Sequence, residues 1–342
     1  MKIHTLLFAS FAIALSCTNT TKDKVIVTPT SLTSKVVFDD VGIGKAEHIL
    51  FQANKLVVTK NLPEELILVY DLASSSRTTM GQYGDGPGEI RNPWSLQKSK
   101  EPDQFWVASI GQKMLSKFNI ASGDMLAEEQ IKLKGEATVI MEPLALNDSL
   151  LIGSGLDGKS IFTVFNREGE IIERLGDWSE KTEFGEYPAH VVSALYEGRL
   201  RTNGSQVLYS CIALDRFMLL DLVKMEMEEF QGPFHIQPEF GTVPDRGVSV
   251  FAPSPDTKFG FIDSFLSDDY VYLLYSGLSP KEITQTGKMA NDLLVYDLKG
   301  NLVHHFLLDV SLKAFSIDEN TNTIYGLTSY MNDDAKVVRF QF

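Results

Sequence analysis

The sequence has few cysteines, a minority of basic residues and no long hydrophobic run. Two cysteines in 342 residues exclude a disulfide scaffold and any metal site built from several cysteines. Lys and Arg number 31 against 45 Asp and Glu, a formal charge of −14, and no Lys/Arg cluster stands out. Because phosphate binding needs such clusters, nucleic acid is not an expected partner. With 44% hydrophobic and 22% charged residues, the chain has a globular composition.

Catalytic and phosphate-binding motifs are also missing. The chain contains no His-Glu-x-x-His, Gly-x-Ser-x-Gly, phosphate loop or Cys-x-x-Cys. The six histidines are dispersed, and the adjacent His304 and His305 would face opposite sides of a strand. Cys211 lies in an apolar stretch and is interpreted as a buried small hydrophobe. The sequence therefore predicts no catalytic residue and no dedicated metal or cofactor site.

The N-terminus is typical of a bacterial lipoprotein signal. Lys2 precedes an apolar run at residues 6–15, which is too short to span a bilayer as a permanent helix. Small residues then lead to Cys17, so residues 1–16 are predicted to be removed and Cys17 to be acylated. A plain secretory signal is the alternative, because Ala14 stands where Leu is usual in lipoprotein signals.

Residues 17–33 are polar and rich in threonine, which is typical of a flexible tether. Thr18 follows the cysteine, so the acidic residue that retains some lipoproteins in an inner membrane is absent. The bacterial outer membrane is therefore the expected location within the cell envelope, with the lipid as the only membrane contact. Residues 34–342 are left as the folded domain.

An internal repeat is the strongest signal for the fold. A short apolar strand ending in Asp or Asn, often with Gly shortly after, recurs at intervals of 48, 47, 55, 76 and 44 residues. Each copy follows a second short strand, and most are flanked by a third and a fourth. The copies are Leu68–Asp71, Leu115–Asn119, Phe162–Asn166, Met218–Asp221, Leu293–Asp297 and a weaker Val337–Gln341.

Four antiparallel strands in each repeat of this length predict an all-β fold, a six-bladed β-propeller. The last repeat runs out of chain after three strands, and Ser34–Asp39 has the alternation to supply the fourth and close that blade. Such closure removes an unpaired sheet edge. Val191–Tyr196 is predicted as the first strand of the fourth blade, and Ser279–Ala290 as a short helix. A β-sandwich or two unrelated β domains are the alternatives.

Several segments resemble the TolB-like six-bladed propeller lipoproteins of Bacteroidetes-type bacteria. The resemblance covers the chain from about residue 40 to the end, mostly in strands and turns. It implies a lipid-anchored propeller and transfers no catalytic residue, because the family has no assigned enzymatic activity. The segments are Gly84–Glu89, Ala194–Arg201, Phe259–Asp263, Tyr270–Gly277, Leu294–Asn301 and Phe315–Asn320.

The long connections are predicted to emerge on one face of the propeller, and loops of this length are usually functional. They are Met80–Pro93, Gly176–His190, Gln231–Lys258 and Ser276–Asn291. We expect a ligand at this long-loop face, near the mouth of the central channel, because mixed aromatic and charged side chains suit a carbohydrate, peptide or protein. The candidate ligand-binding residues are Asp85, Glu89, Arg91, Trp178, Glu186, Tyr187, His190, Phe234, His235, Arg246 and Tyr275.

The glycine-rich turn Gly84–Glu89 has a second interpretation. Its backbone could cradle an anion, but Asp85 and Glu89 repel one and no helix follows. A structural turn between blades, with Glu89 or Arg91 paired locally, is the simpler hypothesis.

Two functions of different classes follow from these patterns. The leading hypothesis is a non-enzymatic binding or protein-interaction module at the cell envelope, with no cofactor. The alternative is a hydrolase, lactonase or lyase that uses a cation such as calcium in the channel. That alternative requires carboxylates to converge on the axis, and the candidates are Glu47, Glu142, Glu186 and Asp263. An envelope sensor or assembly partner is a third hypothesis, which rests on fold analogy alone.

Overall fold

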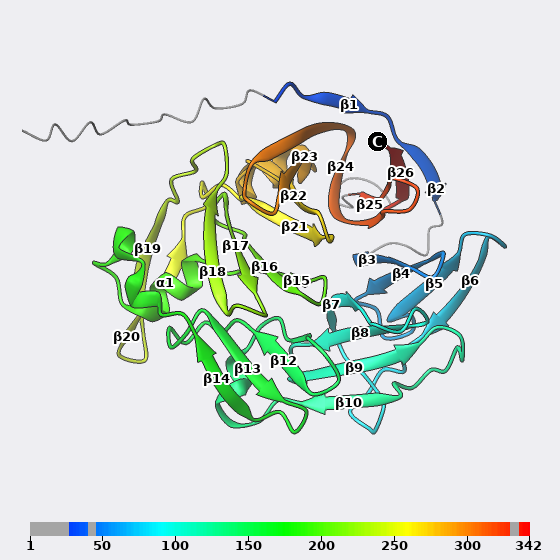
Figure 1. Ribbon diagram of the computed structural model, residues 1–342, viewed down its shortest axis with the longest axis horizontal. Helices are drawn as coiled ribbons and strands as arrows, with labels where there is room; N and C mark the ends of the chain where they lie inside the picture. Colours follow the sequence, from blue (N-terminus) through cyan, green and yellow to red (C-terminus); the bar gives the residue numbers. More distant parts are fainter. Residues whose placement is uncertain (1–26, 40–45, 329–334) are drawn as a thin grey trace, which may run out of the picture.

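Antiparallel strands radiate around a central channel in the computed structural model (Figure 1). The structure describes residues 27–39, 46–328 and 335–342. The predicted signal peptide, Cys17 and the first part of the predicted tether lie outside these residues. Among the described residues, no helix is long and apolar enough to cross a membrane.

Four blades are separate four-stranded sheets, each antiparallel and in simple sequential order. Blade 1 contains β3 (Ala46–Gln52), β4 (Lys55–Lys60), β5 (Ile67–Asp71) and β6 (Ser76–Met80). Blade 2 contains β7 (Pro93–Lys98), β8 (Gln104–Ser109), β9 (Met114–Asn119) and β10 (Glu129–Lys132). Blade 3 contains β11 (Leu144–Ala145), β12 (Leu150–Gly153), β13 (Phe162–Asn166) and β14 (Ile171–Leu175). Blade 4 contains β15 (Gly198–Thr202), β16 (Gln206–Cys211), β17 (Arg216–Asp221) and β18 (Glu226–Gln231).

Blades 5 and 6 share one strand and form a single eight-stranded sheet. The first half of β24 is the outer strand of blade 5, and its second half is the inner strand of blade 6. When the sheet is divided at the middle of β24, its two halves are blades 5 and 6. The structure therefore confirms the predicted six-bladed propeller. Its strands are β21 (Phe261–Leu266), β22 (Tyr270–Tyr275), β23 (Ala290–Asp297), β24 (Leu302–Asp318), β25 (Thr323–Thr328), β26 (Val337–Gln341), β2 (Lys35–Phe38) and β1 (Thr30–Leu32).

The N-terminal strand closes the last blade, as predicted. β2 pairs antiparallel with β26 and supplies the fourth strand of blade 6. The preceding β1 lies within the predicted tether, but it pairs parallel with β24 at the outer edge of blade 5. The N-terminal segment therefore covers two sheet edges that would otherwise expose unpaired backbone groups.

The two middle strands of each blade are the most apolar because both of their faces are buried between neighbouring blades. Five of the six residues of β8, β16 and β22 are buried. The outer strand β18 is mostly exposed and carries three glutamates. This gradient from middle to outer strand is the pattern that made the repeat visible in the sequence.

The Asp or Asn that ends each repeat has a local structural role. The Oδ1 atom of Asp71 accepts hydrogen bonds from the amides of Ala73 and Ser74, at 2.9 and 3.0 Å. The carboxylate of Asp221 accepts the same pair of bonds from Val223 and Lys224. These side chains fix the turn into the outer strand, so the repeated Asp/Asn marks turn geometry and not chemistry.

One predicted strand is wrong. Residues 191–196, predicted as the first strand of blade 4, belong instead to helix α1 (Ala189–Leu195) and its end. The first strand of this blade is β15, a few residues later. A short buried apolar run cannot be assigned to helix or strand by periodicity alone. The short helix predicted within Ser279–Ala290 is present as α2 (Pro280–Thr286), which begins with a capping box at Ser279.

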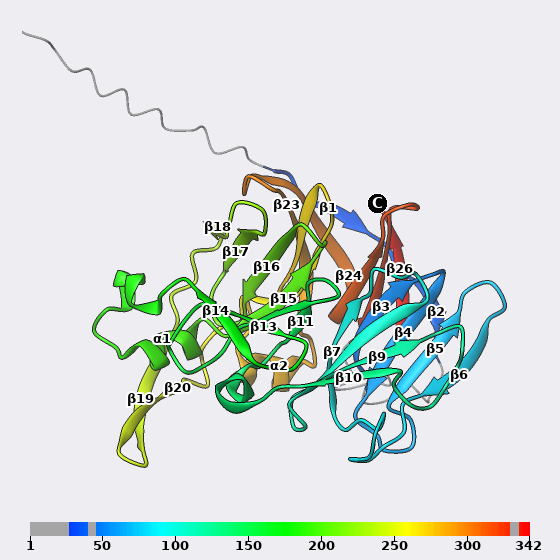
Figure 2. The same cartoon turned by 60° about the horizontal axis from the view of Figure 1, so that its bottom comes forward.

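The long connections do lie on one face. The connections that contain α1, α2 and the hairpin of β19 (Phe240–Asp245) and β20 (Val248–Pro253) join fourth to first or second to third strands. Figure 2 shows α2 and the projecting hairpin at the same side of the propeller, opposite the short turns near β17 and β18. We call this the long-loop face.

Candidate functional site

The main cavity lies at the mouth of the central channel on the long-loop face, and we call it the mouth pocket. Its volume is about 390 Å³, within the range of small-ligand sites. In each blade the first strand is the inner one, which lies next to the channel. The floor and walls of the pocket come mainly from the first residues of such strands, in β3, β7, β15, β21 and the second half of β24. It is lined by Glu47, His48, Asn61, Asn92, Pro93, Trp94, Arg199, Ile212, Phe259, Ile262, Asp263, Met289 and Lys313.

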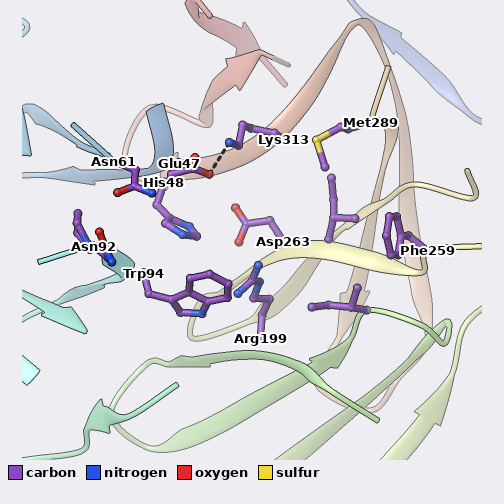
Figure 3. A pocket seen from close by; sticks show the side chains of 13 residues that line it. Glu47, His48, Asn61, Asn92, Trp94, Arg199, Phe259, Asp263, Met289 and Lys313 are labelled. Atoms are coloured by element: carbon purple, nitrogen blue, oxygen red, sulfur yellow. Dashed lines mark hydrogen bonds and ion pairs between the residues drawn. The ribbon is translucent and has the colours of Figure 1, made fainter. Parts of the chain in front are cut away.

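One side of the mouth pocket is polar. Figure 3 shows His48, Trp94 and Arg199 grouped on this side, with Asp263 between them and the opposite wall. The guanidinium carbon of Arg199 lies 5.4 Å from the centre of the Trp94 ring, a cation–π contact. The Nη1 atom of Arg199 donates to Glu142, which leaves other N–H groups of the guanidinium without a partner in the described part of the chain.

The opposite side is apolar. Ile212, Phe259, Ile262 and Met289 line it and come from loops and strands of blades 4 and 5. Figure 3 shows Phe259 and Met289 across the cavity from His48 and Trp94. The pocket therefore offers hydrogen-bonding groups on one wall and a surface for an apolar body on the other.

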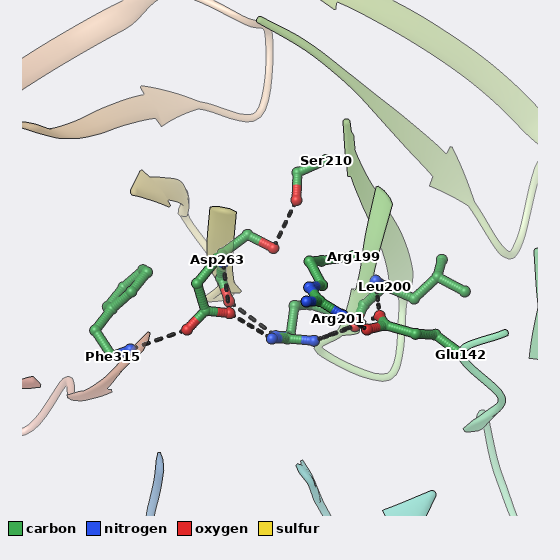
Figure 4. A network of polar contacts seen from close by, with 8 residues as sticks. Glu142, Arg199, Leu200, Arg201, Ser210, Asp263 and Phe315 are labelled. Carbon is green, nitrogen blue, oxygen red and sulfur yellow. Dashed lines mark hydrogen bonds and ion pairs between the residues drawn. The ribbon is translucent and has the colours of Figure 1, made fainter. Parts of the chain in front are cut away.

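A buried ionic network holds the polar wall in place (Figure 4). The carboxylate of Glu142 accepts from Arg199 at 2.6 Å and from the amide of Leu200 at 2.8 Å. Arg201 donates to the carboxylate of Asp263 and to the carbonyl of Ser264. Alternation along β15 would place Arg199 and Arg201 on one side of the strand, and both reach this network.

Asp263 is held from two blades. Its Oδ1 atom accepts from Arg201 and from the amide of Ser264, and its Oδ2 atom accepts from the amide of Phe315 at 2.9 Å. The side chain is buried, so each of these bonds compensates for lost hydration. Asp263 thereby links the neighbouring blades 4, 5 and 6 at the strands nearest the channel.

His48 experiences the positive charges of this wall. Removal from water, and then Arg199, Arg201 and Lys313, lower the pKa of His48 well below its usual value. The imidazole is therefore neutral near pH 7, with one donor and one acceptor nitrogen. It makes no hydrogen bond within the residues that the structure describes, so both nitrogens are open to a ligand.

Lys313 is occupied by neighbours of the pocket. Its Nζ atom donates to the carbonyl of Ala46 at 2.9 Å and to the carboxylate of Glu47 at 2.6 Å. Burial lowers the pKa of Lys313, and the hydrogen bond with Glu47 opposes that change. Lys313 contributes charge to the pocket and holds Glu47, but it offers less hydrogen-bonding capacity than Arg199.

The proposed channel carboxylates converge only in part. Glu47, Glu142 and Asp263 approach the channel, whereas Glu186 is exposed and does not line the mouth pocket. Each of the three is paired with a cation: Lys313, Arg199 and Arg201 respectively. No group of three or more His, Cys, Asp or Glu among the described residues could hold a metal ion. A divalent cation would have to displace a Lys or Arg, so this donor set does not fit calcium.

The predicted glycine-rich turn makes local contacts. Glu89 accepts hydrogen bonds from the amide of Gly86 and the side chain of Gln82, both at 2.7 Å. Asp85 forms an ion pair with Arg91 at 2.6 Å. These are the local pairings expected of a structural turn. None of the three predicted site residues in this segment lines the mouth pocket.

A second group of predicted site residues lies around α1 and the β19–β20 hairpin. Trp178 is buried, and its indole N–H donates to the carbonyl of Ser160. Tyr187 packs on Phe240, with ring centres 4.9 Å apart, and a ring nitrogen of His190 lies 2.6 Å from the carbonyl oxygen of Ser249. The other two predicted members of this group are exposed, Glu186 before α1 and Arg246 at the hairpin turn.

The third group surrounds the start of the loop after β18. Phe234 stacks on Tyr275, with ring centres 4.0 Å apart, and His235 is exposed beside it. The buried carboxylate of Asp215 shapes this loop by accepting hydrogen bonds from the amides of Phe234, His235 and Ile236. The structure thus brings these predicted residues together, but away from the mouth pocket. A ligand role for the predicted residues on the long-loop face stays a prediction.

Sequence reasoning named Glu47 and Asp263 but missed His48, Trp94, Arg199 and Lys313. Each missed residue lies at the start of an inner strand, next to the channel mouth. Correct inner-strand boundaries would have identified these positions. Arg199 lies outside the first strand predicted for its blade, because that prediction falls on the residues that form α1.

The fold and the pocket define a six-bladed β-propeller with a ligand-sized cavity at one mouth of its channel. A family model described as TolB-like 6-blade propeller-like matches residues 30–320. The chain belongs to this family. No match is found among curated proteins.

Solved structures share the fold. A DUF4221 family member from Bacteroides vulgatus is 12% identical with a TM-score of 0.53, covering 93% of this chain and 97% of that one. A protein from Agrobacterium tumefaciens described as the calcium-binding protein regucalcin is 10% identical with a TM-score of 0.55, covering 92% and 97%. The WD40 repeats of RRP9 are 8% identical with a TM-score of 0.53, covering 90% and 97%. Identities this low show similarity of fold alone.

Proposed function

We propose that the protein is a non-enzymatic binding module whose ligand site is the mouth pocket. The observation that carries this proposal is Arg199, which lines a cavity of about 390 Å³ while part of its guanidinium has no partner among the residues that the structure describes. Donors left open beside a cavity of this size provide both orientation and affinity for a small molecule or the end of a chain. The β-propeller fold itself supports a binding or interaction role.

The channel below the mouth pocket supports binding over catalysis. A second cavity of only about 50 Å³ continues downward and shares His48 and Asp263 with the first. Its lining is mixed, with apolar side chains such as Leu50 and Phe315 beside polar ones such as Gln97, and its small volume leaves little room for a substrate. The three approaching carboxylates are already paired with cations, so they do not supply a free general base.

The proposal is tested with a thermal-shift panel of carbohydrates, short peptides, organic acids and amines. Trp94 is 38% exposed and Tyr83 is 44% exposed, and each lies beside an arginine. Trp94→Ala removes one wall of the pocket, whereas Tyr83→Ala is the matched control on the glycine-rich turn. We expect at least one class of compound to stabilise the parent and Tyr83→Ala but not Trp94→Ala. A panel without any stabilising compound, or equal stabilisation of Trp94→Ala, would contradict the mouth-pocket site.

We also propose that the module is anchored in the outer membrane through a lipid on Cys17. The signal-like N-terminus and the polar segment after it support this. Cys17→Ser should abolish labelling by palmitate and release the protein from the membrane fraction. Cys211→Ser is the control, because Cys211 is buried and free. Retained labelling of Cys17→Ser would overturn the anchor.

The direction of β1 supports an orientation for the anchored protein. β1 pairs parallel with β24, with Thr30 opposite Phe306 and Leu32 opposite Leu308. That part of β24 runs towards the long-loop face, so Thr30 lies nearer the opposite face and the chain enters from there. The twelve residues between Cys17 and Thr30 would reach roughly 40 Å when extended. An anchored chain would therefore present the mouth pocket away from the bilayer.

A further inference from the structure

The mouth pocket has an uneven distribution of unused hydrogen-bonding capacity. The carboxylate of Glu142 accepts hydrogen bonds from Arg199 and from the amide of Leu200. The carboxylate of Asp263 accepts from Arg201 and from the amides of Ser264 and Phe315. Each oxygen of these two carboxylates therefore has at least one hydrogen-bond donor. Within the described ranges, Arg199 instead gives one hydrogen bond, to Glu142, and presents its remaining donors beside His48 and Trp94.

The charged groups around His48 add up to a site that favours an anion. The cations Arg199, Arg201 and Lys313 are paired with the carboxylates of Glu142, Asp263 and Glu47 respectively, and these three pairs cancel in formal charge. A fourth carboxylate, Glu197, acts on Arg199, and burial raises its pKa, which favours its neutral form. The backbone amides that bind Glu142 and Asp263 add positive partial charge to the wall. Burial is the main cause of the lowered pKa of His48, and the three cations add to it.

We infer that the mouth pocket binds an organic carboxylate with an apolar body, its carboxylate on Arg199 and His48 and its body against Phe259 and Met289. The guanidinium fork is suited to a planar carboxylate, and the neutral imidazole adds one N–H donor. The apolar wall on the other side of the cavity accepts an aliphatic or aromatic group. This inference rests on the proposed binding function and names the ligand chemistry of the same site.

Two sources could supply such a carboxylate, and suitable probes distinguish them. N-acetyl-L-phenylalanine represents the C-terminus of a peptide, and 3-phenylpropanoate represents a free organic acid. Each is compared by calorimetry with its neutral amide, which has the same shape. We expect each carboxylate to bind roughly tenfold to a hundredfold more tightly than its amide, because a charge-assisted hydrogen bond in a partly buried site is replaced by a neutral one. The tighter of the two acids identifies the source.

Variants separate this recognition from a structural role. Arg199→Gln should reduce the preference for carboxylate over amide at least tenfold, and Arg199→Lys should restore part of it. Arg216→Gln is the matched control, because Arg216 has the same exposure, carries a carboxylate partner and lies over the Tyr196 ring. It should leave the preference unchanged. The imidazole signal of His48, assigned by its loss in His48→Gln, should shift on addition of the acids in the parent protein.

The outcomes distinguish failure of the inference from failure of the proposed function. Equal binding of acids and amides that still depends on Trp94 would overturn the carboxylate inference and leave the mouth pocket as the site. Binding that neither moves the His48 signal nor depends on Trp94 or Arg199 would overturn both. Retention of the carboxylate preference in a folded Arg199→Gln protein would overturn the role of Arg199.

Discussion

Arg199 at the mouth pocket and Arg216 beside α1 have similar surroundings, but they differ in how many of their N–H donors remain without a partner. Both side chains are 18% exposed, both have a carboxylate partner and both lie over an aromatic ring. Arg216 donates to Gln231, Tyr196, Glu183 and Glu229, so four of the five N–H donors of its guanidinium have partners within the protein. Arg199 donates to Glu142 alone among the described residues and lines a cavity.

The difference shows that a mixture of charged and aromatic residues does not by itself define a binding site. The cluster around Arg216 uses most of its hydrogen-bonding groups in contacts between α1, its connection and blade 4. The cluster around Arg199 has the same composition but keeps donors open next to an empty volume. Unused capacity beside a cavity is therefore the more useful criterion, and it can be tested by perturbing each cluster separately.

The largest effect on stability is expected from Asp215→Ala. The buried carboxylate accepts hydrogen bonds from three backbone amides and from Gln231. Its loss leaves these donors unpaired and should reduce the free energy of unfolding by about 3–5 kcal/mol. Urea titration measures this loss, and binding of 3-phenylpropanoate by the folded protein should not change.

Asp221→Ala is the control in the same blade. Its carboxylate also binds two backbone amides, but at the surface, where water replaces it. We expect a cost of about 1 kcal/mol. A loss for Asp215→Ala no greater than that for Asp221→Ala would show that the loop after β18 does not depend on the buried carboxylate.

A smaller, pH-dependent effect is expected from His48→Gln. Burial and three nearby cations lower the pKa of His48 in the folded protein, whereas the unfolded chain takes up a proton below about pH 6.5. The unfolded state then binds more protons, so stability falls as the pH decreases from 6.5 towards the lowered pKa. His48→Gln should remove a slope of up to about 1.4 kcal/mol per pH unit in this window.

The comparison for that slope is His235→Gln, because His235 lies exposed on the long-loop face. Urea titrations at several pH values between 5 and 7 would give both slopes. Identical slopes for His48→Gln and the parent would show that His48 protonates equally well in the folded protein, which contradicts a pKa lowered by burial and by the neighbouring cations.

The smallest effects on stability and binding are expected in the loops around α1 and the β19–β20 hairpin. His190→Ala loses the contact between the imidazole and the carbonyl of Ser249, and Arg246→Ala changes an exposed hairpin turn. Each should alter stability by about 0.5 kcal/mol or less and leave binding of the acids within twofold. A larger loss of binding than that of Trp94→Ala would move the ligand site to the loops that the sequence indicated.

Much of the fold was predictable because its signals are local. The apolar middle strands recur in every blade, and the Asp/Asn turns, such as those at Asp71 and Asp221, recur in the first five, so together they predict the repeat. The closing strand β2 was predicted from the missing fourth strand of the last repeat. The boundary at α1 was not, because a buried run of mixed apolar residues is compatible with helix and strand.

The site was less predictable because it is assembled from distant positions. Loop length led to the prediction of residues such as His190 and Arg246, whereas the mouth pocket is lined by the first residues of the inner strands. Arg199, His48 and Trp94 come from three different blades and carry no local motif. Their convergence depends on strand direction and on blade order around the channel, which single residues do not report.

The most direct measurement is a crystal structure of the protein soaked with 3-phenylpropanoate. We expect density in the mouth pocket, with the carboxylate within hydrogen-bonding distance of Arg199 and the phenyl ring against Phe259 and Met289. Density among the loops around His190 and Arg246, with the mouth pocket unoccupied, would contradict the central claim that open donors beside the channel mark the binding site.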